Sequence, residues 1–382
     1  MKIIFWTSLV IWAYAYAGYP LLLLLMRLLA GRRDVVRGDV TPRVTILVPV
    51  HNGATIIADK IRRLLALDYP AEQVEIVVVS DGSDDGTGEF VRREAEADPR
   101  VRLVEVAEQR GKENAINEGV AVASGEVVVV SDSGVHPFPG ALRRLVQVFA
   151  DPTVGAATGV DVPEATGGSS VTGVAGFYTR YEIGVRKLEA SAGTMVVVNG
   201  CFFAVRRELV PRLVPHVTAD LFVPFNVIRS GYRVALVPEA AATVRTSRSV
   251  KAEFRRRVRT FNRGITTFFT ALDLLDPFRY GWVGVQVTSH KLARWLVPLS
   301  LVGLLVSTAA LAPSSPGFAG LFLVQLLTYG LALLGLTGVV RGGLEKLASI
   351  PSFYLLSNLS IAMAWLQVIR GKKAGTWQPT VR

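Results

Sequence analysis

Cysteine is almost absent from the sequence, and acidic residues are outnumbered by basic ones. The single cysteine, Cys201, excludes an intrachain disulfide, and we expect its thiol to pack in the core. Internal repeats and low-complexity segments are also lacking. With 31 acidic and 42 basic residues, the formal net charge is +11, which would suit nucleic acid, anionic lipid heads or phosphates. Because no nucleic-acid-binding motif accompanies this charge, a nucleic-acid partner is not expected.

Charge is nearly missing from four long stretches, of which only the first contains a charged residue, Arg27. Each has roughly 18 to 28 residues, enough to cross a bilayer as a helix, and they are Ile3–Ala30, Trp295–Ala312, Phe318–Val340 and Ala348–Ile369. The sequence between the first two is ordinary globular sequence up to about residue 280. We predict an N-terminal transmembrane helix over 1–31, a globular domain over 32–249, amphipathic interface helices over 250–294, two to three transmembrane helices over 295–370 and a tail over 371–382.

The first apolar stretch is expected to be a retained anchor and not a cleaved signal peptide. It is too long for a signal peptide, and only Lys2 supplies a positive start. Arg32 and Arg33 follow it, which predicts a multi-pass protein of the plasma membrane with a cytoplasmic domain. Three further crossings would leave the C-terminus outside, whereas the basic residues of 370–382 favour the inside. We expect Pro351 to break the last stretch, which could then be re-entrant or lie at the interface.

Apolar strands alternate with helical patterns through the first half of the domain. Five runs predict buried strands, over Val44–Val50, Val74–Val79, Val101–Val106, Val127–Val130 and Val154–Val160. Because these strands are apolar on both faces and separated by helices, they predict a mostly parallel, Rossmann-like α/β sheet covered by helices. In the second half, Asn199–Arg207 predicts a strand leading into a helix, Asp220–Arg229 a helix and Arg233–Val237 a short strand. We expect this half to hold the second substrate.

Polar clusters follow three of these strands, at the edge where ligands of such sheets bind. The carboxylates of SDGSDDGT (Ser80–Thr87) could bind a ribose or base, or could form only a turn and a helix N-cap. In RGKENAINEG (Arg110–Gly119), Lys112 could meet a phosphate at a helix start, although a solvated lysine is the simpler interpretation. Asp132, after the strand VVVVS, is either a metal ligand beside a phosphate or a strand end.

Taken together and in this order, the motifs resemble the family 2 glycosyltransferases, which are inverting nucleotide-sugar enzymes with a GT-A fold. The resemblance covers Val44 to about Gly264 and extends through the membrane segments. Its motifs are VPVHNG (48–53), SDGSDDGT, RGKENAINEG, SDSG (131–134), NGCFFAVRREL (199–209), TADLFVPFNVIRSGYRV (218–234) and FRRRVRTFNRG (254–264). Among the subfamilies, the chain looks most like membrane-embedded polysaccharide synthases.

The resemblance implies a function and a set of site residues. A sugar would pass from a UDP- or GDP-sugar to a polysaccharide or lipid-linked acceptor. Asp220 would be the catalytic base that removes the proton from the acceptor hydroxyl. Mg²⁺ or Mn²⁺ would be held by Asp132, with His136 as a further candidate ligand, and Arg256 and Arg259 would contact the acceptor or the diphosphate. The residues expected to bind the nucleotide sugar are Pro49, Asn52, Asp81, Asp84, Lys112, Asn117 and Asp132.

Three positions depart from the family pattern. Gly134 replaces the second acid of Asp-x-Asp, which predicts weaker metal affinity. Ala219 replaces the acid before the base. The Gln-x-x-Arg-Trp element of processive synthases keeps only its arginine in Arg256–Thr260, which weakens the case for processive synthesis. These changes leave a second hypothesis open, a catalytically degenerate partner subunit of an active glycosyltransferase, although the retained Asp132 and Asp220 argue against it.

The stretch Glu253–Phe269 predicts an amphipathic basic helix. Its apolar residues recur at spacings of four and three, and five arginines lie among the remaining positions. Such a helix could lie at a membrane interface beside anionic lipid. It could also pack on the core with a solvated basic face. The apolar stretches that follow favour the interface.

Overall fold

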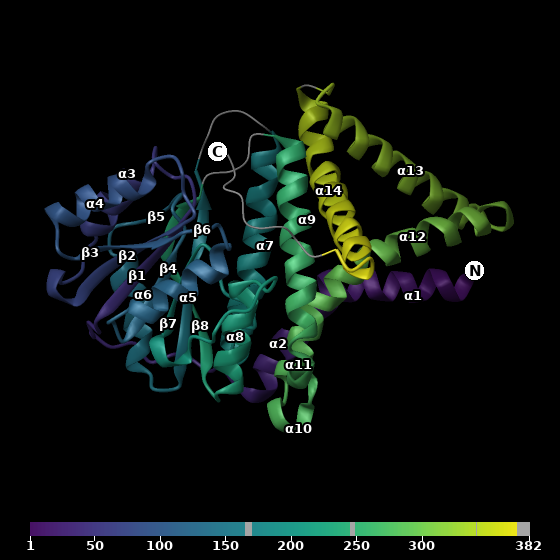
Figure 1. Cartoon of the computed structure of the whole chain (residues 1–382). Coiled ribbons are helices and arrows are strands. Elements are labelled where there is room, and N and C mark those ends of the chain that lie inside the picture. Colours follow the sequence, from purple (N-terminus) through teal and green to yellow (C-terminus); the bar gives the residue numbers. More distant parts are fainter. Residues whose placement is uncertain (165–169, 245–248, 341, 373–382) are drawn as a thin grey trace.

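The computed structural model describes residues 1–164, 170–244, 249–340 and 342–372. An α/β domain forms one side of the molecule, and long helices project from its other side (Figure 1). Most of the predicted tail, from residue 373 onward, and the basic residues at 245–248 lie outside the described residues.

An eight-stranded sheet, counted over the described residues, forms the centre of the domain, with the order β3-β2-β1-β4-β7-β6-β8-β5. The strands are β1 (Val44–Val50), β2 (Val74–Asp81), β3 (Val101–Val106), β4 (Val127–Ser131), β5 (Val135–Pro137), β6 (Val154–Pro163), β7 (Phe202–Arg206) and β8 (Arg233–Val244). β1 to β4 are parallel, and β7 runs antiparallel between β4 and β6. The predicted Rossmann-like, mostly parallel sheet is confirmed.

Two strands differ from the sequence prediction. β5 was not predicted, because it has only three residues and ends in a proline, and its partner β8 is far along the chain. β8 runs to Val244 and does not stop at Val237. The pairing with β6 shifts register between Leu236 and Ala241, so Pro238 falls in the irregular part and the strand continues beyond it.

Helices cover both faces of the sheet. α3 (Ile57–Leu65), α4 (Thr87–Ala97) and α6 (Ala141–Val146) pack on one face, and α5 (Lys112–Val122) and α8 (Ala219–Arg229) on the other. α9 (Val250–Phe269) contacts α8 farther from the sheet. Successive strand residues point to opposite faces of the sheet. Ile46 and Val48 therefore join the core beneath α3, α4 and α6, whereas Leu47 joins the core beneath α5 and α8. All seven residues of β1 are buried, as expected for a central parallel strand.

Four helical segments in the described part of the chain are long and apolar enough to cross a membrane. The first comprises α1 (Lys2–Ala13), a π-helical turn and α2 (Tyr19–Ala30). The others are α11 (Val283–Val287) running through a π-helical turn into α12 (Ala293–Leu311), then α13 (Pro316–Thr337) and α14 (Gly343–Ile369). The expected N-terminal and C-terminal apolar helices are therefore present.

The expected break at Pro351 is wrong, because α14 continues through this residue as one helix. Three of its polar side chains have their donor groups satisfied within the helix. Ser357, Asn358 and Ser360 donate to the carbonyls four residues earlier at 2.7, 2.9 and 2.7 Å. A helix can therefore carry these residues in apolar surroundings without unwinding.

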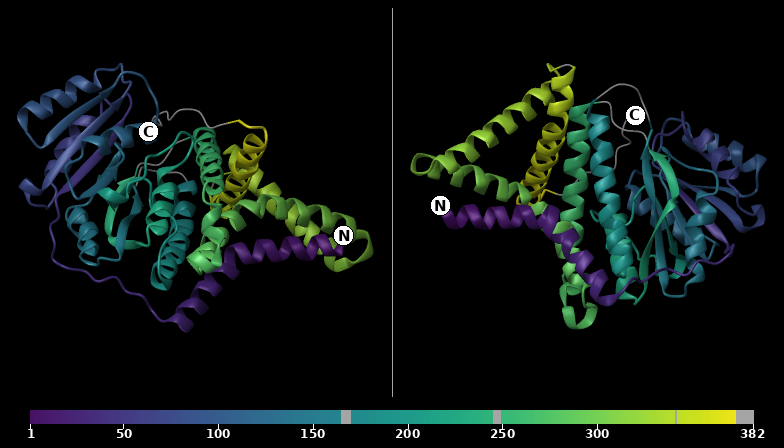
Figure 2. Two further views of the ribbon diagram at one scale, coloured as in Figure 1. Left: turned by 60° about the horizontal axis from the view of Figure 1, so that its bottom comes forward. Right: turned by 180° about the vertical axis from the view of Figure 1, so that it is seen from behind.

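α9 lies between the domain and the apolar helices, next to α7 (Ser170–Ala192) and α14 (Figures 1 and 2). Its apolar side packs as predicted, with Val258, Ile265 and Phe268 buried. Its basic side is not simply solvated, because Arg257 pairs with Glu253 and Arg263 with Glu113. That α9 lies at a membrane interface stays a prediction.

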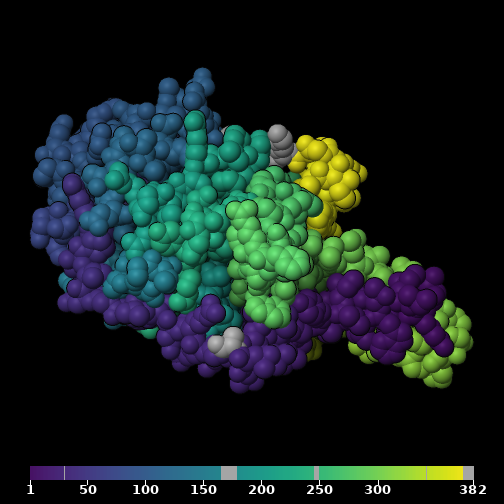
Figure 3. Space-filling model, turned by 90° about the horizontal axis from the view of Figure 1, so that it is seen from below, coloured from purple at the N-terminus to yellow at the C-terminus, as the bar shows by residue number. Residues whose placement is uncertain are grey.

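The segment between α2 and β1 runs along the underside of the domain (Figure 3). The Gly38 N–H donates to the Gln147 carbonyl at 3.1 Å, and the Val36 N–H donates to Asp151 Oδ2 at 3.3 Å. The first apolar helix is thus connected to the domain by a segment that packs on its surface.

Candidate active site

The ends of β4 and the start of α5 bring a lysine and an acid together. Lys112, the first residue of α5, donates from Nζ to Asp132 Oδ1 and to the Gly200 carbonyl at 2.8 Å. Their side chains are 13% and 23% exposed, so the pair is largely shielded but open to one side. Burial by itself would lower the pKa of Lys112, but the negative charge of Asp132 outweighs it and raises the pKa. Lys112 therefore stays a cation at this edge of the sheet.

Asp220 lies on the other side of Gly200. It is the second residue of α8, and its Oδ1 accepts a bond from the hydroxyl of the N-cap residue Thr218. Its backbone carbonyl accepts from the Val198 N–H at 3.0 Å. A β-carbon built on Gly200 would lie 3.1 Å from the Asp220 Cβ, so this glycine lets Asp220 approach closely. The structure thus brings Lys112, Asp132 and Asp220 together around one glycine.

The acidic loop after β2 divides its carboxylates among different tasks. Asp81 is only 1% exposed, and its two oxygens accept the N–H groups of Arg110 at 2.9 Å and Gly111 at 2.7 Å, which fixes the start of α5. Asp85 accepts the Thr87 N–H at 3.0 Å and so caps α4. The side chains of Asp84 and Asp85 are both exposed, but the Asp85 carboxylate is occupied by bonds from the Ala54 and Thr87 N–H groups. Asp84 is therefore the better placed of the two to meet a ligand.

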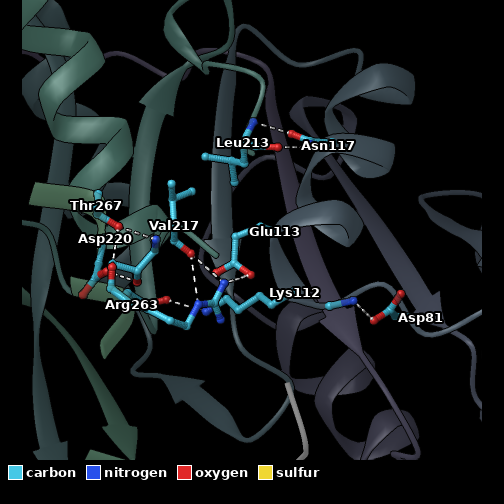
Figure 4. A network of polar contacts seen from close by, with 12 residues as sticks. Asp81, Lys112, Glu113, Asn117, Leu213, Val217, Asp220, Arg263 and Thr267 are labelled. Atoms are coloured by element: carbon cyan, nitrogen blue, oxygen red, sulfur yellow. Dashed lines mark hydrogen bonds and ion pairs between the residues drawn. The ribbon is translucent and has the colours of Figure 1, made fainter. Parts of the chain in front are cut away.

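Other residues that were predicted to bind the nucleotide sugar hold strands and loops in the described structure. Pro49 is buried inside β1. Asn52 has a left-handed backbone (φ 50°), and its Oδ1 accepts the Asp84 N–H at 3.0 Å. Asn117 exchanges two bonds with the backbone of Leu213, at 2.8 and 2.9 Å, and so holds the segment that leads to Asp220 (Figure 4). Direct contact of these residues with a donor stays a prediction.

The two predicted arginines of α9 have different surroundings. Arg256 makes two bonds to Glu253, at 2.9 and 2.7 Å. Burial would raise the pKa of Glu253, but Arg256 and Arg257 hold it at about 2, so this carboxylate is ionised. Arg259 makes no ion pair with any described residue. Its guanidinium is therefore available to bind an anion.

A metal ion finds few ligands here. The described residues include no group of three or more His, Cys, Asp or Glu side chains that could hold one. His136 lies on β5, four residues after Asp132. Mg²⁺ often binds through one or two carboxylates together with substrate phosphates, and Asp132 meets the lower limit of that scheme. The donor set thus fits an ion that binds together with a diphosphate.

Four residues of this region were not predicted from the sequence. Lys60 of α3 is fully buried and donates to Ser131 Oγ at 2.7 Å and to the Val135 carbonyl, on either side of Asp132. Its sequence signal is its position on the apolar face of the helix, between Ile57 and Ile61. Glu113 and Arg263, which are 150 residues apart in the sequence, form an ion pair. Gly200 is the glycine that separates Asp220 from the Lys112–Asp132 pair. These last three lie within motifs of the resemblance, but nothing in the local sequence indicates their contacts.

Known glycosyltransferases are similar to this chain in sequence. A family model described as "Glycosyltransferase like family 2" matches residues 42–262, which is more than half of the chain. The poly-beta-1,6-N-acetyl-D-glucosamine synthase of Staphylococcus aureus (strain COL) is 27% identical over 236 residues, covering 60% of this chain and 56% of that protein. The probable glycosyltransferase YdaM of Bacillus subtilis (strain 168) is 26% identical over 235 residues, covering 57% and 54%. The chain spans about half the length of these curated relatives.

One solved structure resembles the whole chain. It is the mannosyltransferase PcManGT from Pyrobaculum calidifontis, in complex with GDP-Man and Mn²⁺. The TM-score is 0.72 at 25% identity, over 97% of this chain and 99% of that one. The shared architecture therefore includes the apolar helices as well as the α/β domain. With its sheet, its site and its match over residues 42–262, this chain belongs to the family 2 glycosyltransferases.

Proposed function

We propose that this chain is a membrane-bound hexosyltransferase, which transfers a sugar from a UDP- or GDP-sugar to a polysaccharide or lipid-linked acceptor with inversion. The observation that carries the proposal is the position of Asp220, separated by Gly200 from the Lys112–Asp132 pair. The similar proteins support sugar transfer, since one is a synthase of an N-acetylglucosamine polymer and another is a mannosyltransferase with GDP-Man. The four apolar helices and the basic residues after the first support a plasma-membrane protein with a cytoplasmic domain.

Asp220 can take the acceptor's proton through one oxygen. Oδ1 is occupied by the Thr218 hydroxyl, whereas Oδ2 has no hydrogen-bond partner among the described residues. Oδ2 would accept the hydroxyl proton as the acceptor oxygen attacks the anomeric carbon. A single attack opposite the departing diphosphate inverts that carbon.

The opposite side of the site is suited to the departing diphosphate. The Lys112 ammonium stands at the start of α5, where the helix dipole also favours negative charge. Arg259 and Arg256 on α9 supply further positive charge. Positive groups fixed in advance stabilise charge that develops in the transition state. Mg²⁺ or Mn²⁺, held by Asp132 when bound, would add to this neutralisation.

The test measures the release of UDP or GDP from a panel of UDP- and GDP-sugars. The full chain is assayed in native membranes with added glycan or lipid-linked acceptors. We expect release with one donor class and its loss in Asp220→Asn and Asp132→Ala. Glu96→Gln, which alters an exposed acid of α4, is the matched control and should keep wild-type activity. Unchanged activity in both site variants would remove the proposed site.

A second candidate is a catalytically degenerate partner subunit of an active glycosyltransferase. Gly134 and Ala219, which replace acids of the family pattern, favour it. In the same panel this candidate predicts nucleotide-sugar binding without turnover in the presence of every acceptor.

A further inference from the structure

Two side chains of α9 hold the same peptide group, two residues before Asp220. The Val217 carbonyl accepts bonds from Arg263 Nε at 3.0 Å and from Arg263 Nη2 at 2.6 Å. The Thr218 N–H, which belongs to the same peptide unit, donates to Thr267 Oγ1 at 2.9 Å (Figure 4). The Thr218 hydroxyl then donates to Asp220. Both polar atoms of this peptide are thus fixed by one helix, and the peptide leads directly to the base.

The same guanidinium also reaches the donor side of the site. Arg263 Nη2 pairs with Glu113 Oε2, and Glu113 follows Lys112 on α5 (Figure 4). The side chains of Arg263 and Glu113 are 14% and 10% exposed, so water competes little for this pair. One side chain therefore contacts both the segment that carries Asp220 and the helix that carries Lys112.

Stability alone does not explain this arrangement. The attraction in a buried ion pair is largely offset by the loss of hydration, so such pairs are weak evidence for a stabilising role. The planar fork of arginine, however, binds two acceptors in fixed directions, which a lysine ammonium does not do. The geometry is what is specific to arginine at this position.

The helix that supplies Arg263 is itself held from behind. The Asn262 amide donates to the Lys372 carbonyl at 3.1 Å, at the end of α14. A β-carbon built on Gly264 would lie 3.1 Å from the ring of Trp295 on α12. α9 thus connects the apolar helices to the segment that carries the base.

We infer that Arg263 is a positioning residue for the transfer reaction, which sets Asp220 relative to the Lys112–Asp132 pair. The inference rests on the proposed function. Since a misplacement of about 1 Å in a reacting pair can cost roughly 100-fold in rate, a bond network that fixes the base has a measurable kinetic effect. Arg263 acts through Thr218 and the backbone and does not itself contact the reacting atoms.

The test compares Arg263→Lys with Arg255→Lys, which changes an exposed arginine of the same helix, in the full chain in nanodiscs. We expect Arg263→Lys to lower kcat about tenfold or more, while the donor KM and the Kd for UDP or GDP change by less than about twofold. Added to Asp220→Asn, the same change should cause little further loss, because residues that act through one group are not additive. Arg255→Lys should match the wild type.

Three further variants keep the test decisive if Arg263→Lys folds poorly. Glu113→Gln should lower kcat in the same way. Thr267→Val should also lower kcat, and Thr267→Ser, which restores the acceptor for the Thr218 N–H, should recover it. Unchanged kcat in Arg263→Lys, Glu113→Gln and Thr267→Val, or losses that add fully to that of Asp220→Asn, would overturn the inference while the proposed function stands. A wild-type chain without transfer, or an active Asp220→Asn, would overturn the function and the inference with it.

Discussion

Gly200 is the residue at which the smallest change in volume tests the proposed site. A β-carbon there would lie 3.1 Å from the Asp220 Cβ, and the Gly200 carbonyl already accepts a bond from Lys112. We expect Gly200→Ala to displace Asp220 and to lower kcat about tenfold or more, with little change in the donor KM. Steady-state kinetics of the purified chain measure both constants. Gly184→Ala on α7, where a β-carbon meets nothing within 4 Å, should behave as the wild type, and equal losses in both variants would contradict the argument.

Gly134 is the residue that we expect to limit the proposed metal site. With Asp132 as the only nearby acid of the family pair, we expect Mn²⁺ to bind weakly unless a nucleotide diphosphate supplies further oxygens. Gly134→Asp should restore a second carboxylate and tighten Mn²⁺ binding, by about tenfold or more if one good ligand is gained. Calorimetric titration of Mn²⁺ with and without UDP or GDP checks both statements. A variant that binds Mn²⁺ no more tightly than the wild type would show that residue 134 does not limit the site.

The strand-end residues of the site could be predicted from the sequence, but the residues that hold them could not. Parallel strands bring their carboxyl ends to one edge, so Lys112 and Asp132 were expected to lie close together. Gly200 and Arg263 come from segments far along the chain, and their roles depend on contacts that no local pattern encodes. Lys60 is intermediate, because a lysine on the apolar face of a helix indicates a buried charge without naming its partner.

Lys60 joins α3 to the turn between β4 and β5, and its titration should make the free energy of unfolding depend on pH. Burial lowers the pKa of Lys60 from 10.5 to about 7. Between these two values the unfolded chain binds a proton that the folded chain has lost, so the contribution of Lys60 to stability rises with pH, by at most about 1.4 kcal/mol per pH unit. Lys60→Met should remove this rise. Melting temperatures of the detergent-solubilised chain at pH 7 and 9 measure it, and equal pH slopes in the two proteins would contradict the assignment.

The strands and helices of the domain were predictable to different degrees. Long apolar runs such as Val44–Val50 mark buried strands, because only a central strand is apolar on both faces. β5 could not be predicted, because a strand of three residues shows no alternating pattern. The break expected at Pro351 is wrong, because the helical pattern around the proline continues through it. In α14 the neighbouring helices and the internal bonds of its polar side chains outweigh the proline.

The arrangement of the whole molecule indicates which segments extend away from the domain. The start of α1 meets the start of α13 at the end of the molecule farthest from the domain, where Phe5 and Phe318 have ring centroids 5.1 Å apart (Figure 1). The second half of α14 instead stays close to α9, both near its middle and just beyond its C-terminal end. Arg257 of α9 donates to Ser357 at 2.6 Å, and Lys372 accepts from Asn262 of α9. These contacts hold the second half of α14 against α9, so we predict that α14 lies along the domain side of the bilayer, although it is long and apolar enough to cross.

This arrangement predicts that the C-terminus lies on the same side as the domain, in agreement with the basic residues that follow α14. Because Cys201 is the only cysteine, single reporters can be placed in a Cys201→Ala chain. Ser314→Cys, in the exposed turn between α12 and α13, should react with a membrane-impermeant maleimide in intact cells. Lys372→Cys, and Glu96→Cys on the domain, should react only after the cells are permeabilised. If Lys372→Cys reacts in intact cells as readily as Ser314→Cys, α14 crosses the membrane and the C-terminus is outside.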